Sequence, residues 1–94
     1  MTTKPTKDAI LAAMRTAQLD PTQSARSNII KLIEALVLGL NQPPPFGWTQ
    51  LAPKVLEEAG CPPVDGNSLR WHLAKLRAEV FECDIRVLDI IAPE

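Results

Sequence analysis

The sequence predicts a mainly α fold: four helices, of which the last two form a helix-turn-helix, and a short C-terminal β-strand. Apolar residues recur at helical spacing in four separate segments, which indicates four amphipathic or buried helices. Segments that contain proline and glycine separate these helices. The last apolar segment instead combines β-branched residues with alternating polar ones, a pattern typical of a strand.

The chain has 94 residues, 46% of them hydrophobic and 22% charged, so we expect a single folded domain over residues 1–94. Residues 1–6 are predicted to be a flexible tail. The first helix should run from Lys7 to about Gln18, because Thr6 is a suitable N-cap and Pro21 disfavours helix before it. Its buried stripe consists of Ile10, Leu11, Met14 and Ala17.

The second helix is predicted to begin near Thr22 or Ser24 and to end at Gly39 or Asn41, before three consecutive prolines. Its apolar residues cover more than half of its circumference: Ile29, Ile30, Leu32, Ile33, Leu36, Val37 and Leu40. A helix of this kind is buried by several neighbours. Those neighbours are either the other helices of a monomer or a second copy of the chain, and the pattern does not choose between them.

Residues 46–48 can form a very short strand or an apolar plug. The third helix is predicted over 50–59, with Thr49 as its N-cap, Pro53 near its first turn and Gly60 as its stop. Its inward side chains are Leu51, Ala52, Val55, Leu56 and Ala59, and its outward ones are Lys54, Glu57 and Glu58.

The fourth helix is predicted from about Ser68 to Val80, after the turn GCPPVDGN, with Asn67 or Ser68 as its cap. Leu69, Leu73, Leu76 and Val80 share one arc of this helix, whereas the opposite arc carries Trp71, Ala74, Lys75 and Ala78, flanked by Arg70, Arg77 and His72. One face should therefore be buried, and the other presents cations, an indole and an imidazole.

The final segment, ECDIRVLDIIA, is predicted to be the strand. Its backbone groups need partners. The strand would pair with residues 46–48, with a second copy, or with another protein.

A helix with this outer face, set behind another helix and a turn, suits the major groove of double-stranded DNA. The candidate DNA-binding residues are Thr49, Gln50, Asn67, Ser68, Arg70, Trp71, His72, Lys75 and Arg77. Basic residues nearer the N-terminus would hold phosphates. The cations could instead form an ordinary solvated face, and Trp71 could lie under the first helix or in a dimer contact.

Catalysis, metal binding and cofactor binding are not expected. His72 is the one histidine; Ser68 lies four residues before it, but Leu76 stands where an orienting acid would be needed. No phosphate-binding glycine loop occurs. Cys61 and Cys83 have no metal-ligand spacing, and we expect both to be small, reduced, apolar residues.

Net charge is −1, but it is unevenly distributed. Residues 1–31 carry mainly cations, whereas residues 78–94 carry mainly acids. The N-terminus lacks a signal-peptide pattern and no apolar run is long enough to cross a membrane. We therefore expect a cytoplasmic protein without membrane contact.

The segment NSLRWHLAKLRAEVF resembles the recognition-helix segment of bacterial winged helix-turn-helix regulators, including ArsR-like repressors. The matching residues are Ser68, His72, Leu73, Leu76 and Arg77, and the preceding WTQLAPKVLEEAG is similar to the first helix of such a unit. The resemblance covers about residues 46–90. It implies the order strand, helix, turn, helix, strand, and a homodimeric, sequence-specific DNA-binding protein, a transcriptional repressor or an accessory factor.

This chain departs from that pattern in three respects. Its turn is longer, its wing is reduced to one strand, and the metal-sensing cysteines have no counterpart. An alternative function is a protein-interaction module, an adaptor or anti-regulator, that docks on a protein partner through its exposed strand and an apolar helix face.

Overall fold

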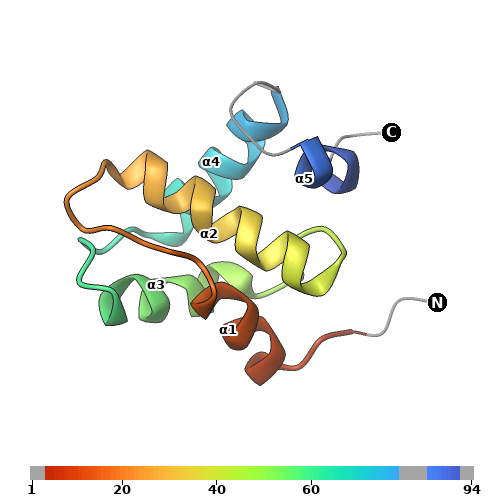
Figure 1. Ribbon diagram of the computed structural model, residues 1–94, viewed down its shortest axis with the longest axis horizontal. Coiled ribbons are helices and arrows are strands. Elements are labelled where there is room, and N and C mark those ends of the chain that lie inside the picture. The colour runs from red at the N-terminus through yellow and green to blue at the C-terminus, as the bar shows by residue number, and fades with distance from the viewer. Residues whose placement is uncertain (1–3, 79–84, 92–94) are drawn as a thin grey trace.

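The computed structural model of the protein describes residues 4–78 and 85–91 (Figure 1). Within these ranges lie five helices: α1 (Lys7–Arg15), α2 (Ala25–Leu40), α3 (Trp48–Glu58), α4 (Gly66–Ala78) and α5 (Ile85–Ile91). The mainly helical prediction is confirmed. The predicted C-terminal strand is wrong, because residues 85–91 are helical, and the described ranges contain no strand from which a wing could be built.

Helix α2 is the centre of the domain (Figure 1). It packs against α1, α4 and α5, while α3 packs against α1 and α4. The core contains the buried apolar side chains of all five helices, which include Ile10, Met14, Ile29, Leu32, Ile33, Leu36, Val37, Trp48, Val55, Leu56, Leu69, Leu76, Val87 and Ile91. Burial within one chain accounts for the apolar circumference of α2, so this pattern does not require a second copy.

Helix α1 begins where it was predicted to begin. The Oγ1 atom of Thr6 accepts a hydrogen bond from the backbone N–H of Ala9 at 3.1 Å, which is N-cap geometry. The helix ends earlier than predicted, at Arg15 rather than Gln18, and Thr16 is its C-cap. The guanidinium of Arg15 donates two hydrogen bonds of 3.0 Å to the carboxylate of Glu58, which ties α1 to the end of α3.

Both ends of α2 lie close to their predicted positions. Ser24 is the N-cap, and its hydroxyl accepts from the backbone N–H of Ser27 at 3.1 Å. Asn41 is the C-cap, in the left-handed region with φ of 54°. The amide of Asn28, which is 1% exposed, exchanges hydrogen bonds with the backbone of Asp20 and fixes the α1–α2 loop.

Helix α3 starts earlier than predicted, at Trp48, and Gly47 rather than Thr49 is its N-cap. Residues 46–48 are therefore not a strand. Trp48 is 5% exposed and acts as the predicted apolar plug, whereas Phe46 is 92% exposed. Pro53 lies inside the helix, beyond the first turn in which it was predicted.

Helix α4 also begins earlier than predicted, at Gly66. The carboxylate of Asp65 accepts from the backbone N–H of Ser68 at 2.7 Å, so Asp65 caps the helix in place of the predicted Asn67 or Ser68. Residues 59–65 connect α3 to α4. The predicted helix end at Val80 lies outside the described residues, as do Cys83 and the side chain of Arg77.

Helix α5 shows why the strand prediction failed. Val87 and Ile91 are both buried, and they lie four residues apart on one helical face. Arg86 and Asp89 are exposed. A helix forms backbone hydrogen bonds within itself, so this segment covers α2 without the neighbouring strand that a strand would need.

Candidate nucleic-acid interface

The two faces of α4 differ as the sequence predicts. Leu69 and Leu76 are 0% and 1% exposed, and Leu73 is partly buried against the core. The side chains of Arg70, Trp71, Ala74 and Lys75 are exposed, and Trp71 reaches 55%. Trp71 is thus not covered by α1. The sequence of α4 contains no acidic residue, so among its described side chains the exposed charges, Arg70 and Lys75, are both positive.

Arg70 joins the start of α4 to the start of α3. Its guanidinium donates to the side-chain carbonyl of Asn67 at 2.6 Å and to the hydroxyl of Thr49 at 3.3 Å. A Cβ atom added at Gly66 would lie 3.6 to 3.8 Å from Arg70 and Thr49. These are ordinary van der Waals distances, so the guanidinium lies close to Gly66 between the two helix starts without requiring glycine there.

The start of α3 carries the exposed positive end of a helix dipole. Its N-cap, Gly47, has φ of 92° and supplies no side-chain hydrogen bond. Thr49 and Gln50 lie in this first turn and line a hollow of about 230 Å³ together with Arg70 and Phe46. The N–H groups of Trp48 and Gln50 donate to the carbonyls of Pro45 and Gly47. What favours an anionic ligand such as a phosphate here is therefore the helix dipole together with the guanidinium of Arg70, not a set of free N–H groups.

The start of α4 differs because a carboxylate already occupies it. The pKa of Asp65 is lowered, first by the hydrogen bond from the backbone N–H of Ser68, and also by the Ser68 hydroxyl and the charge of Arg70. This ionised group neutralises the positive end of the α4 dipole. A phosphate would therefore be held at the start of α3, whereas α4 contributes its side chains.

Three side chains form a cluster on the outer face of α4. The rings of Trp71 and His72 meet edge to face, with centroids 5.0 Å apart and an interplanar angle of 85°. The ammonium group of Lys75 lies 6.0 Å from the centroid of the Trp71 ring. These contacts limit the rotamers of an exposed indole, and a side chain held in this way loses little entropy on binding.

His72 and Ser68 meet through the backbone rather than through the hydroxyl. The Nδ1 atom of His72 lies 2.7 Å from the carbonyl oxygen of Ser68. A carbonyl can only accept, so Nδ1 is the donor, and the neutral ring presents Nε2 as an acceptor. The Ser68 hydroxyl instead helps to lower the pKa of Asp65. This geometry gives no support to a serine–histidine catalytic pair.

The basic residues near the N-terminus are used in different ways. Arg15 is paired with Glu58. Lys4 and Lys7 line a hollow of about 260 Å³ with Phe46 and Gln50, which places them near the start of α3.

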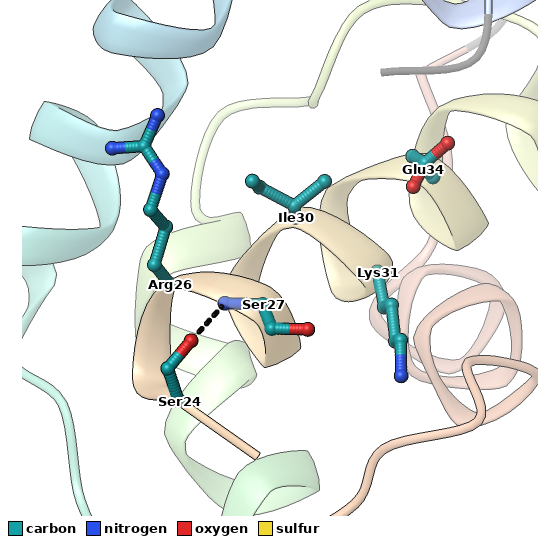
Figure 2. Close-up of a pocket in the computed structure, with 6 residues that line it drawn as sticks. All are labelled: Ser24, Arg26, Ser27, Ile30, Lys31 and Glu34. Atoms are coloured by element: carbon teal, nitrogen blue, oxygen red, sulfur yellow. Dashed lines mark hydrogen bonds between the residues drawn. The ribbon is translucent and has the colours of Figure 1, made fainter. Parts of the chain in front are cut away.

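Another hollow, of about 420 Å³, lies along the outer side of α2 and is lined by Ser24, Arg26, Ser27, Ile30, Lys31 and Glu34. Figure 2 shows Arg26 extending toward α4 and Lys31 pointing away from it. The lining mixes both signs of charge, and a hydrogen bond already joins Ser24 to Ser27. This hollow has no convergent set of polar groups aimed at one ligand.

Eight of the nine predicted site residues have described side chains, and all eight lie on two adjoining helices. Asn67, Ser68, Arg70, Trp71, His72 and Lys75 lie on α4, whereas Thr49 and Gln50 lie at the start of α3, where Thr49 is bonded to Arg70. The side chain of Arg77 is not among those described. Asp65 and Phe46 were not predicted as site residues. Phe46 and Trp48 were predicted together as a short strand or an apolar plug, and only the structure shows that one is exposed and the other buried.

Metal ligands, the Cys61 thiol and membrane-spanning helices can each be judged from the described residues. Among the described side chains, no three His, Cys, Asp or Glu residues come close enough together to hold a metal ion. Cys61 is buried with a free thiol, as predicted. In the part of the chain that the structure describes, no helix has the length and apolar character needed to span a bilayer. Comparison with protein-family models, curated proteins and solved structures found no match to this chain.

Proposed function

We propose that this protein binds double-stranded DNA in a sequence-specific manner, with the outer face of α4 in the major groove. The observation that carries the proposal is the open, acid-free outer face of α4, on which Arg70, Trp71 and Lys75 are exposed. A single helix of this kind fits the width of the major groove of B-DNA. We infer that α3, residues 59–65 and α4 act as a helix-turn-helix.

Each group has a distinct role in this proposal. Arg70 and His72 read base edges, since a guanidinium can donate two hydrogen bonds to guanine and Nε2 of His72 can accept one. Thr49 and Gln50, with the positive end of the α3 dipole, hold a phosphate and set the register. Lys75 adds a phosphate contact near the middle of α4. A protein with this function would act as a transcriptional repressor or as an accessory factor on DNA.

The alternative function, a protein-interaction module, is less well supported. It depends on an exposed strand and on an apolar helix face. Residues 85–91 form α5, and the apolar residues Leu69 and Leu76 of α4 are buried. Neither docking element is offered by the residues that the structure describes.

The experiment is a selection from a pool of random duplexes, followed by binding of the enriched duplex to purified variants. We expect the full chain to enrich one short sequence and the combined Arg70→Ala, Lys75→Ala variant to lose measurable binding. The matched control is Lys31→Ala with Lys54→Ala, which removes the same charge from positions that do not lie on α4. Circular dichroism would establish that both variants are folded. Failure of the full chain to enrich any sequence, or equal binding by the two double variants, would refute the proposal.

A further inference from the structure

Phe46 is the most exposed large apolar side chain that the structure describes. It is 92% exposed, compared with 55% for Trp71 and 37% for Leu38. Single apolar residues on a surface are common. Phe46 differs from them because of how it is held and because of the charges around it.

The backbone that carries Phe46 is held in a fixed conformation. Three prolines precede it, and they restrict the backbone before the turn. The carbonyl of Pro45 then accepts a hydrogen bond of 3.1 Å from the N–H of Trp48, which closes a turn around Phe46 and Gly47. Trp48 is buried and anchors the far side of this turn. The aromatic ring is therefore presented to solvent from a rigid support, which lowers the entropic cost of binding.

The surroundings of Phe46 are basic. Its side chain borders two hollows, one shared with Arg70 and the other with Lys4 and Lys7. No acidic residue is among the described residues that line either hollow. An exposed aromatic ring between cations complements a nucleic acid, which offers apolar base surfaces between phosphates.

We propose that Phe46 makes a second contact with the same duplex, as an apolar wedge between base pairs in the minor groove next to α4. This inference rests on the proposed function. The 230 Å³ hollow at the start of α3, where a phosphate would bind, is lined by both Arg70 and Phe46. With α4 in the major groove, a phosphate backbone seated in this hollow would bring the neighbouring minor groove to Phe46. Apolar side chains inserted in this way unstack a base step and bend the duplex.

The test compares Phe46→Ala and Phe46→Leu with the unaltered chain on the enriched duplex. We expect Phe46→Ala to weaken binding about tenfold, to reduce the DNA bend seen by gel retardation of permuted fragments, and to leave the salt dependence unchanged, because an apolar contact releases no counterions. Phe46→Leu keeps an apolar wedge and should retain most of the bend. Leu38→Ala is the matched control, since it truncates another exposed apolar residue, on α2.

The outcomes separate this inference from the proposed function. If the unaltered chain binds no duplex, both are overturned. If it binds but Phe46→Ala keeps its full affinity and bend, or loses no more than Leu38→Ala, the wedge alone is overturned. Loss of self-association in Phe46→Ala with unchanged DNA binding would assign the ring to a protein contact and would also overturn the wedge. Because Phe46 is exposed, its truncation should leave the melting temperature unchanged.

Discussion

Replacement of the buried amide of Asn28 should loosen the α1–α2 loop by a predictable amount. The Nδ2 atom of Asn28 donates to the carbonyl of Asp20 at 2.8 Å, and the N–H of Asp20 donates to Oδ1 at 2.9 Å. Asn28→Leu preserves most of the volume but leaves the N–H of Asp20 without its partner, whereas the carbonyl of Asp20 still accepts from the N–H of Gln23 at 3.0 Å. An unpaired buried group costs about 1–3 kcal/mol. Asp20 is only partly buried, so we expect a loss of about 1–2 kcal/mol, in the lower half of that range.

Asn28→Asp is the sharper test, because it changes one donor into an acceptor with almost no change of shape. The introduced carboxyl can donate to the carbonyl of Asp20 only when it is protonated. Together with burial, this requirement raises its pKa in the folded state above the value of about 3.9 in the unfolded state. The unfolded chain therefore releases the proton first as the pH rises. Stability of this variant should fall by up to about 1.4 kcal/mol per pH unit, from about pH 4 until the folded-state pKa is passed.

The measurement is urea unfolding followed by the fluorescence of Trp48 and Trp71, at several values between about pH 4 and pH 7. The quantity compared is the difference in unfolding free energy between Asn28→Asp and the unaltered chain, so that the other carboxyl groups cancel. Gln23→Glu, which adds the same charge at an exposed position of this loop, is the control and should give a nearly constant difference. A pH-independent difference for Asn28→Asp would refute the reasoning.

Three further predictions concern binding, packing and capping. Because Lys75 is assigned a phosphate contact, Lys75→Ala should lower the slope of log affinity against log salt by about 0.9, which corresponds to about 3.5-fold of the affinity lost between about 50 and about 200 mM salt. Anisotropy titrations that show the same slope for Lys75→Ala and the unaltered chain would contradict this. Gly39→Ala should destabilise the fold by about 1 kcal/mol, although alanine has a higher helix propensity than glycine, because the new Cβ would lie 2.9 Å from the Cβ of Ala13. Thermal unfolding measures this loss of stability, and the added substitution Ala13→Gly should recover part of it. Because the folded-state pKa of Asp65 is lowered, its stabilising effect is present above its unfolded-state pKa and is lost as the pH falls through the folded-state value. Asp65→Asn retains a cap without the charge, so acid unfolding monitored by circular dichroism should show a weaker loss of stability than in the unaltered chain, and identical acid transitions would exclude this role.

Helical periodicity in the sequence was sufficient to predict α1 to α4, with starts within a few residues of those observed. It also predicted which side of α4 is buried, because Leu69 and Leu76 must enter the core of so small a domain. The starts of α3 and α4 were each predicted late. Thr49 and Ser68 are good capping residues by type. In the structure, however, Gly47 and Asp65 precede them and are the N-caps at which α3 and α4 begin.

The C-terminal segment could not be predicted from residue type alone. Its β-branched residues favour a strand, whereas Val87 and Ile91 also share a helical face, and a short segment fits both periods. The packing against α2 decides between the two, because α2 presents an apolar helical surface on which α5 packs and has no strand edge with which a strand could pair. Exposure of Phe46 was equally beyond the sequence, because it depends on the turn that buries its neighbour Trp48.

If α4 lies in the major groove as proposed, the length of its exposed part limits how many base pairs one molecule can read. From Asn67 to Lys75 the helix advances about 12 Å, which matches about three to four base pairs. A sequence of four base pairs occurs by chance about once in 250 positions, whereas a genome contains roughly a million or more competing non-specific sites. Occupancy of a single genomic site would therefore require contacts with further base pairs, either in another groove or through a second molecule bound to the adjacent DNA.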